Sequence, residues 1–442
     1  MNSFLGFFFI SKMIFIFSWY KIIYFFNKDY EYFIYNLTKS LSKINILYIK
    51  VFQAIAFNYK VIDENLNKEL IKFTDNAPWT NEDIDYITLQ ELSKNENIIL
   101  DEPKYSGMIS LVYTFERENK IFAIKIKRNN IDYKLNKAIQ ELIFLIKLLS
   151  YFSFFKEYKL YDIVNKHIDF IQKQIYFEEE VDNLIKMREN CKKLKYIKIP
   201  VVYPEITKKY SNVIMMEYLD GIKLNNIPSE HYESFAKQVF KFGFVTTYYH
   251  GFTHADLHAG NILFIKEDNY YKLGILDFGM MLTIDNEYKF KLFELLYDIF
   301  EEDVNIVAKN ILCSNVIIQP VEIIENLPKE HYDYLIEFIV KLLNDTIHNK
   351  ENTTQYRIYE FISKFHEYIN KYSIFSFGLY LNDNFIKTQL ILIMYHGIFM
   401  KLCKNNWLEI FNKTINELFH MELLNELRSN NLMIVSKKEN ML

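Results

Sequence analysis

The arrangement of apolar and polar positions changes character near Asp277. Before it, short apolar runs separated by charged turns predict strands. Residues 109–115 and 122–126 alternate loosely and are joined by the charged turn 116–120, which indicates a hairpin. After it, apolar residues recur at helical spacing, and in 290–299 they cover a broad helix face. The pattern therefore predicts an α+β protein whose first part carries the strands and whose second part is helical.

The first 36 residues form a separate apolar segment. Residues 4–26 are apolar and aromatic, are interrupted by Lys12 and Lys21, and precede the first acidic residue, Asp29. Neither uninterrupted piece reaches the ~20 apolar residues that cross a bilayer, although the lysines can snorkel if the segment spans as one. A mitochondrial targeting segment and a plain buried helix are the alternatives, and we favour a membrane-associated N-terminus.

Composition and charge change this picture little. Half of the 442 residues are apolar, which is enough for a large core, and the net charge of −4 gives no sign of a nucleic-acid partner. Cys191, Cys313 and Cys403 are widely spaced and odd in number. That spacing argues against a disulfide framework or a zinc knuckle and favours reduced core thiols.

The strongest chemical signal is the segment 254–261, which reads His-Ala-Asp-Leu-His-Ala-Gly-Asn and is followed by Asp277-Phe278-Gly279. Phosphoryl transfer surrounds the transferred group with negative charge. Catalysis therefore needs a divalent metal held by a carboxylate and an amide, and a further carboxylate near the acceptor. Asp256, Asn261 and Asp277 supply these three groups, which indicates the phosphoryl-transfer machinery of a kinase-like fold.

The spacing also predicts how these groups meet. Residues 262–264 and 271–276 are apolar and predict two strands paired across a turn at 266–269. Such a hairpin returns Asp277 to the metal that Asn261 binds.

A zinc site is the alternative for the pattern His-x-Asp-x-His. Asn261 and Asp277 are hard oxygen ligands that suit magnesium, so we disfavour zinc. We expect His254 to be structural, packing under the loop and bonding its backbone.

A kinase also needs a lysine on a strand to hold nucleotide phosphates and a helical carboxylate to orient that lysine. Lys125 lies within the predicted strand 122–126, after a Ser106-Gly107 loop that we assign to the nucleotide. Three acids at 178–180 begin a segment of helical spacing, and of these we choose Glu180 as the partner. Taken alone, Lys125 would be a solvated strand lysine and the acids a helix start favoured by the dipole.

A hinge between two lobes is predicted after these elements. Residues 213–217 form a short apolar run, and Asp220-Gly221 supplies a turn after it. We expect backbone groups around Glu217 to hold the adenine.

Together these residues resemble the UbiB family of atypical kinases, also called AarF-domain kinases. Residues 254–261 are similar to that family's His-Ala-Asp-Pro-His-Pro-Gly-Asn, and residues 122–128 to its Val-Ala-Val-Lys-Val-Gln-Arg. Glu180 and Asn183 are similar to its Glu-Ala-x-Asn helix. The resemblance covers about residues 40–400 and implies ATP, magnesium and a two-lobed fold.

Three features depart from the family pattern. The family's Lys-x-Gly-Gln motif, which lies in an extension that folds over the active site, is matched by Lys50 and Gln53, but Phe52 replaces its glycine. A phenyl ring predicts that the extension docks differently or is partly displaced. The family's Glu-x-Asp is replaced by residues 174–176, which contain no acid, and Ser106-Gly107-Met108 replaces its Ala-Ala-Ala-Ser loop.

We therefore predict a two-lobed protein-kinase-like fold of the α+β class, with a small β-rich N-lobe, a helical C-lobe and an N-terminal helical extension. Its five segments are residues 1–36, apolar; 37–100, the extension; 101–222, the N-lobe with a helical insertion; 223–428, the C-lobe; and 429–442, a tail.

A second apolar stretch, 142–155, predicts a helix between the extension and the N-lobe. Its alternative is a membrane-facing surface, but at 14 residues it is too short to span.

The expected function is that of an atypical kinase or ATPase that uses magnesium and ATP, with Asp256, Lys125 and Glu180 in catalysis. By resemblance it would serve ubiquinone biosynthesis or mitochondrial lipid homeostasis at a membrane. A membrane lipid or prenylated small molecule is then the expected acceptor, and a protein substrate is disfavoured. The alternatives are an inactive nucleotide-binding membrane scaffold of the same fold and a small-molecule kinase of the aminoglycoside and choline type.

Overall fold

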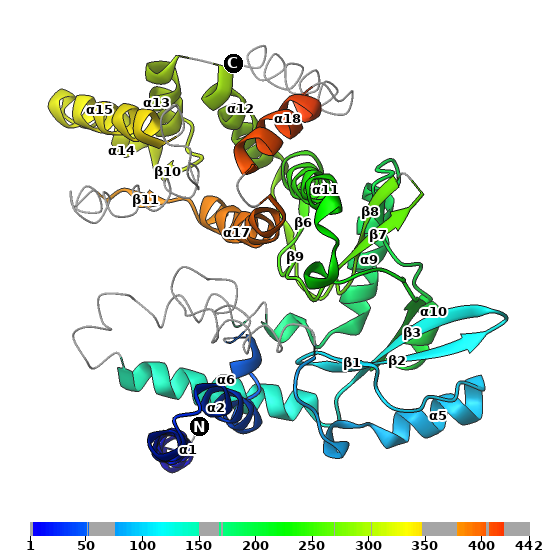
Figure 1. Ribbon diagram of the computed structural model, residues 1–442. Coiled ribbons are helices and arrows are strands. Elements are labelled where there is room, and N and C mark those ends of the chain that lie inside the picture. Colours follow the sequence, from blue (N-terminus) through cyan, green and yellow to red (C-terminus); the bar gives the residue numbers. More distant parts are fainter. Residues whose placement is uncertain are drawn as a thin grey trace. The chain divides into compact units, whose positions relative to one another are not determined.

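The computed structural model describes most of the chain, in two compact units. The described residues are 3–50, 52, 76–149, 168, 171–268, 270–301, 303–346, 378–403 and 406–419. The first unit contains residues up to 227 together with 258–280, and the second contains 228–257 and the residues from 281 onward (Figure 1). The sequence prediction instead assigned residues 223–428, which include 258–280, to the C-lobe.

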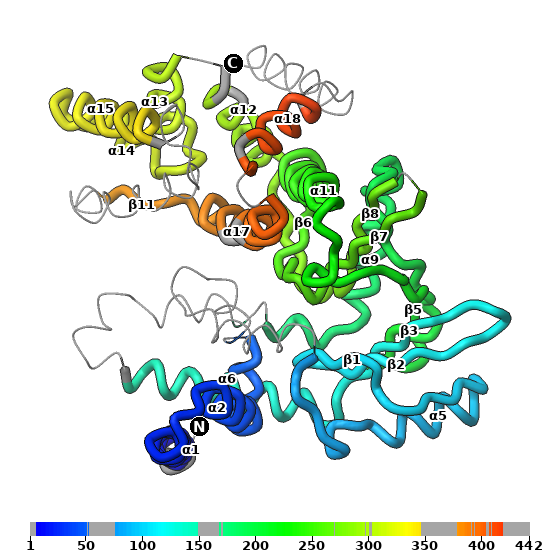
Figure 2. The backbone as a smooth tube through the Cα atoms, in the orientation of Figure 1, coloured from blue at the N-terminus to red at the C-terminus, as the bar shows by residue number. Residues whose placement is uncertain are grey.

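A four-stranded antiparallel sheet in the order β1-β2-β3-β5 forms the centre of the first unit. Its strands are β1 (Tyr105–Ser106), β2 (Ser110–Arg117), β3 (Lys120–Lys127) and β5 (Val213–Glu217). The predicted hairpin is confirmed, because β2 and β3 pair along their full length (Figure 2). Only Glu118 and Asn119 connect them, with φ of 53° and 60°, as a two-residue primed turn requires.

The two faces of this sheet have different roles. One face packs against α5 (Tyr86–Glu96) and α10 (Pro204–Lys209), and its buried core includes Leu92, Leu111, Tyr113, Ile124, Ile126, Val213 and Met215. Because successive side chains of a strand point to opposite faces, Lys125 projects from the other face. There it meets α9 (Phe177–Asn190), the helix predicted from the three acids.

The hairpin predicted before Asp277 is also confirmed. β7 (Ile262–Glu267) pairs antiparallel with β8 (Tyr270–Ile275). β8 pairs in parallel with the short β4 (Ile197–Lys198), which is why residues 258–280 belong to the first unit.

Three helices at the N-terminal side complete the first unit. α1 (Ser3–Asn27) and α2 (Tyr30–Ile44) form a helical hairpin, and α6 (Ile131–Leu149) lies beside them (Figure 1). The Asn45 side chain joins these helices, because its amide donates to the Ala138 carbonyl over 3.0 Å and to the Glu141 carboxylate over 3.1 Å. α6 contains the start of the apolar stretch 142–155, whose remainder lies outside the described residues.

The second unit is mainly helical, as the sequence predicts. Its described α-helices are α11 (Tyr232–Phe244), α12 (Asn286–Glu301), α13 (Val304–Cys313), α14 (Val321–Glu325), α15 (Lys329–Thr346), α17 (Asp383–Cys403) and α18 (Trp407–Phe419). The short pairs of β6 (Phe252–His254) with β9 (Met281–Thr283) and of β10 (Ile318–Gln319) with β11 (Tyr380–Leu381) were not predicted.

Two described helices are long and apolar enough to cross a bilayer by length and composition. In Gly6–Asn27 only 11% of the apolar window is buried, whereas in Asp383–Cys403 the share is 50%. The second of these, α17, packs against α11 so closely that the Tyr395 ring leaves no room for a Cβ at Gly243. α17 is therefore a core helix of the second unit.

Candidate functional site

Lys125 and Glu180 form a buried ion pair in the first unit. The Lys125 ammonium lies 2.7 Å and 2.9 Å from the two oxygens of Glu180, and the two residues are only 7% and 2% exposed. The Phe177 ring, one turn before Glu180 on α9, lies 5.5 Å from the ammonium and adds a cation–π contact. The strand and the helix thereby hold the lysine in one position.

Asp277 is the second carboxylate on this lysine. Its Oδ2 lies 3.0 Å from the Lys125 ammonium, and its side chain is 40% exposed, in contrast to Glu180. The backbone at Asp277 has φ 57°, a left-handed conformation that is strained for a residue other than glycine. The Gly279 N–H donates to Asp277 Oδ1 over 3.1 Å and helps to hold this turn.

Side chains of helix α9 also form hydrogen bonds with the backbone N–H and the carbonyl of Phe278. Glu180 Oε1 accepts the Phe278 N–H over 3.3 Å, and the Asn183 amide donates to the Phe278 carbonyl over 3.1 Å. Because these residues are three apart, they lie on one face of the helix. The Phe278 side chain is fully buried, so the turn that carries Asp277 is fixed by packing as well.

The charges of the site oppose the effect of burial. Burial alone would lower the pKa of Lys125, but the carboxylates of Asp277 and Glu180 raise it, so the lysine stays charged. Burial raises the pKa of Glu180, and Lys125 opposes that rise. The pKa of Asp277 is lowered, because the charges of Lys125 and Lys50 outweigh burial.

The positive charge of Lys50, in the extension, therefore contributes to the electrostatic potential at Asp277. Close to Lys50 in the sequence, the Tyr48 hydroxyl donates to Met13 Sδ over 3.0 Å, and its ring stacks on Phe52 with centroids 5.9 Å apart. Burial, with Glu141 nearby, raises the pKa of Tyr48 to about 12. The phenyl ring of Phe52 is buried in the structure. Whether the extension docks differently or is partly displaced stays a prediction, since most of it after Phe52 lies outside the described residues. Gln53 lies outside the described residues.

Asn261 lies before β7 in the same unit and is buried at 9% exposed. Its carbonyl accepts the Leu276 N–H over 2.8 Å, which fixes the loop next to the residue that precedes Asp277. The same loop is held by Lys223, whose ammonium donates to the Gly260 carbonyl over 2.9 Å. A partly exposed carboxylate and a neighbouring amide are a donor set that fits magnesium.

His254 and Asp256 belong to the second unit. His254 is fully buried, and its Nδ1 accepts the Asp256 N–H over 3.1 Å, so it has the structural role that the sequence predicts. The Tyr395 hydroxyl of α17 donates to the His254 carbonyl over 3.4 Å. These contacts fix the backbone that carries Asp256.

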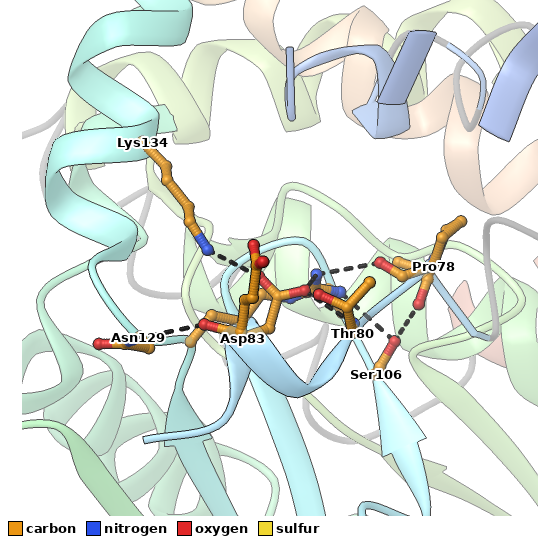
Figure 3. A network of polar contacts seen from close by, with 10 residues as sticks. Pro78, Thr80, Asp83, Ser106, Asn129 and Lys134 are labelled. Atoms are coloured by element: carbon orange, nitrogen blue, oxygen red, sulfur yellow. Dashed lines mark hydrogen bonds and ion pairs between the residues drawn. The ribbon is translucent and has the colours of Figure 1, made fainter. Parts of the chain in front are cut away.

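The loop at Ser106 and Gly107 belongs to a second polar network, centred on the buried Arg128. Figure 3 shows this network, with Ser106, Pro78 and Asp83 labelled. The guanidinium donates to the Gly107 carbonyl over 2.7 Å and to the Pro78 carbonyl over 3.0 Å, and it pairs with Asp83 at 3.2 Å. The Ser106 hydroxyl donates to the Ala77 carbonyl. Our assignment of Ser106 and Gly107 to the nucleotide stays a prediction, and here the Ser106 hydroxyl and the Gly107 carbonyl are hydrogen-bonded to Ala77 and Arg128.

The same holds for Glu217 at the end of β5. Its N–H donates to the Val201 carbonyl over 2.7 Å, and its side chain accepts the Val201 N–H over 3.2 Å. Its role toward adenine stays a prediction.

The network around Arg128 was not predicted. Asp83 accepts from Lys134 over 2.8 Å as well as pairing with Arg128. The available signal was the arginine that ends the motif at residues 122–128. Gln174 is one of the residues that replace the family's Glu-x-Asp, and it lies beside the site. Its Cα is 3.9 Å from the position that a Cβ on Gly279 would take.

Comparison with known proteins gives the class. Residues 78–311, more than half of the chain, match the ABC1 atypical kinase-like domain, so the chain belongs to this UbiB/ABC1 family of two-lobed kinase-like proteins.

Individual relatives are more distant. Protein ACTIVITY OF BC1 COMPLEX KINASE 8, chloroplastic, of Arabidopsis thaliana is 25% identical over 60% of this chain and 36% of its own length. A probable protein kinase UbiB of Shewanella woodyi is 25% identical over 61% of this chain and 51% of its own length. The chain thus spans about a third to a half of these two relatives. A solved structure of Mycobacterium tuberculosis Rv3197 with erythromycin aligns with 13% identity and a TM-score of 0.47, over 80% of this chain and 87% of that one.

Proposed function

We propose that the protein binds magnesium and ATP at Lys125, Glu180, Asn261 and Asp277 and transfers or hydrolyses the terminal phosphate. The observation that carries this proposal is the unequal exposure around Lys125. Glu180 is buried and holds the lysine, whereas the Asp277 side chain is 40% exposed and has a lowered pKa. It is therefore an ionised oxygen ligand accessible from solvent.

Each residue has a distinct part in the proposed reaction. Lys125 holds the α and β phosphates, and Glu180 orients it. Asp277 and Asn261 hold magnesium, which when bound neutralises charge on the phosphate oxygens. Asp256 positions the acceptor hydroxyl and takes its proton as the acceptor oxygen bonds to the γ phosphorus. The bond from that phosphorus to the bridging oxygen breaks, and ADP leaves with the bonding electrons.

Gln174 bears on the number of metal ions. The UbiB family pattern has an acid at this position and another at Tyr176, and this chain has neither. Fewer carboxylates beside Gly279 favour a single, weaker magnesium site. This observation also supports the second candidate, a scaffold that binds nucleotide without turnover.

Family membership and the apolar N-terminal helix support a membrane setting. On this basis we propose a membrane lipid or a prenylated small molecule as the acceptor, in ubiquinone biosynthesis or lipid homeostasis. We place the protein in mitochondria or a related organelle. The Arabidopsis relative is named as a chloroplastic protein, which indicates an organelle for that protein.

The test is thermal unfolding of the full chain with and without magnesium and ATP. A ligand at about 100 times its Kd adds roughly 2.7 kcal/mol to the free energy of unfolding, which for units of this size raises Tm by about 5–10 °C. We expect this shift in the native protein and its loss in Asp277→Asn. Asp268→Asn is the matched control, because Asp268 is exposed on the same hairpin and also has positive φ, 51°.

The result also separates the two candidates. A shift accompanied by release of ADP supports the kinase or ATPase, whereas a shift without turnover supports the scaffold. No shift in the native protein would refute nucleotide binding at this site.

A further inference from the structure

Helix α1 presents a continuous apolar face to solvent. Its exposed aromatic and aliphatic side chains include Phe8, Phe15, Trp19, Ile22, Phe25 and Phe26. At 3.6 residues per turn, these six fall within an arc of about 120° of the helix surface. Phe15 is 67% exposed and Phe26 is 79% exposed, so the face is not covered by the described parts of the fold. A patch of this kind marks an interaction surface.

The opposite face of α1 is fastened to its own unit. Phe9 is 3% exposed, and at Gly6 a Cβ would come within 2.5 Å of the Phe144 ring on α6. Met13 accepts the Tyr48 hydroxyl, and the Tyr20 hydroxyl lies 3.1 Å from Ser40 Oγ on α2. These contacts run along much of the helix.

This attachment decides how α1 can meet a bilayer. If α1 crossed the membrane in its present packing, it would carry α2 and α6 into hydrocarbon. α2 bears charged residues such as Glu31 and Lys43, and α6 contains Glu141, which are costly there. Length and hydropathy alone permit spanning, but the packing does not.

The two lysines within α1 lie at the edges of the apolar face. By helical geometry Lys12 falls just beyond Trp19 on one side of the arc, and Lys21 falls just beyond Phe25 on the other. The Lys12 ammonium lies 4.9 Å from the Phe8 ring, and the Lys28 ammonium at the end of the helix lies 4.5 Å from the Phe25 ring. The aliphatic stems of these lysines lie along the helix, and their ammonium groups lie at the edges of the apolar face, where they can bind lipid phosphates. α1 contains no acidic residue that would repel those phosphates.

We propose that α1 is a monotopic anchor, which inserts its exposed face into one leaflet of an anionic bilayer and lies in the membrane plane. The occupant is a lipid surface because an aromatic and aliphatic face bordered by lysines matches the boundary between acyl chains and anionic headgroups. The binding and orientation of α1 at a membrane do not depend on the proposed phosphoryl transfer.

Vesicle flotation of the full chain tests the binding. Vesicles of phosphatidylcholine with about one-third phosphatidylglycerol should carry the native protein upward, and phosphatidylcholine alone should carry less. The double variant Phe15→Glu with Trp19→Glu should lower the vesicle partition coefficient more than about tenfold. Ile87→Glu with Tyr133→Glu is the matched control, because these side chains are 72% and 71% exposed on α5 and α6. Its partitioning should equal the native value.

Two flotation results and one change of oligomeric state would overturn the proposal. The native protein could fail to float, or the α1 variant could float as well as the native protein. The α1 variant could also convert a native dimer to monomer without a change in flotation, which would make a second copy the occupant. Far-ultraviolet circular dichroism of both variants checks that they remain folded.

Insertion depth separates lying in the plane from spanning. Ser11, Ser18 and Phe25 lie on the exposed face seven residues apart, about 10 Å per step along the helix. Each is replaced by Trp in Trp19→Phe protein, and quenching by lipids brominated at different acyl positions is measured, with the Trp19→Phe signal subtracted for Trp79 and Trp407. An in-plane helix predicts the same depth at all three positions. A depth that differs by about 10 Å between successive positions would show a spanning helix and refute the proposal.

Discussion

Two ion-pair networks in the first unit use a buried cation in opposite ways. Around Lys125 one cation meets two carboxylates, and one of these, Asp277, remains partly exposed. Around Arg128 two cations meet a single carboxylate, Asp83, and the guanidinium also donates to backbone carbonyls. In the first network the two carboxylates outnumber the paired lysine, so Asp277 can also bind a metal ion. The second is satisfied internally and ties segments together, so burial of charge alone does not identify a site.

The largest effect is expected from removing the first cation. Lys125→Met leaves Glu180 buried without its partner, which should cost about 3–5 kcal/mol of unfolding free energy and abolish the response to magnesium and ATP. Urea unfolding measures the loss. The double variant Lys125→Met with Glu180→Gln should recover most of the stability but none of the nucleotide response. Equal stability of the single variant and the native protein would contradict the importance of this pair.

The second cation should affect stability without affecting nucleotide. Arg128→Lys keeps a charge but loses the planar set of donors, which should cost about 2–4 kcal/mol, because carbonyls of Pro78 and Gly107 lose their partner. Thermal unfolding should show a lower Tm with the full magnesium and ATP shift retained. If the shift disappeared, the Ser106-Gly107 loop would act on the nucleotide, and the contrast between the networks would fail.

Acidification should remove the contribution of Asp83. Burial would raise the pKa of Asp83, but the bond from Lys134 and the charge of Arg128 outweigh it and lower the pKa. A carboxylate with a lowered pKa stabilises the fold above its unfolded value of about 3.9, and that stability is lost as pH falls through the folded value. Asp83→Asn should therefore cost about 1–2 kcal/mol at pH near 7 and progressively less below pH about 4. A difference from the native protein that is independent of pH would contradict this assignment.

The smallest effect is expected at the turn that carries Asp277. Asn183→Ala removes one hydrogen bond to the Phe278 carbonyl and should lower the unfolding free energy by about 0.5–1.5 kcal/mol. The nucleotide shift should decrease without vanishing, because Glu180 still accepts the Phe278 N–H. A full loss of the shift would mean that Asn183 positions Asp277 more directly than the geometry indicates.

Local features of the site were predictable from the sequence. Alternation identified β3 and the residue that projects from it, and helical spacing identified α9 after the three acids. The hairpin before Asp277 followed from two apolar runs and a polar turn between them. These features depend on neighbours within about ten positions, where strand and helix periodicity apply directly.

Contacts between distant segments were not predictable in the same way. The Ser106 hydroxyl donates to the Ala77 carbonyl, 29 positions away, and the Asn45 amide donates to Glu141, 96 positions away. A residue type favours a contact, but only the packed chain determines which group supplies it.

The sequence by itself determined the class of the protein, because the motifs that carry Lys125, Asn261 and Asp277 are short and ordered along the chain. By length and composition, α1 and α17 are alike as long apolar helices. Only the tertiary structure distinguished them: α17 buries its apolar surface against α11, whereas α1 packs on one face and exposes the other. The physical reason is that hydropathy measures the preference of a side chain to leave water, and packing decides what it enters.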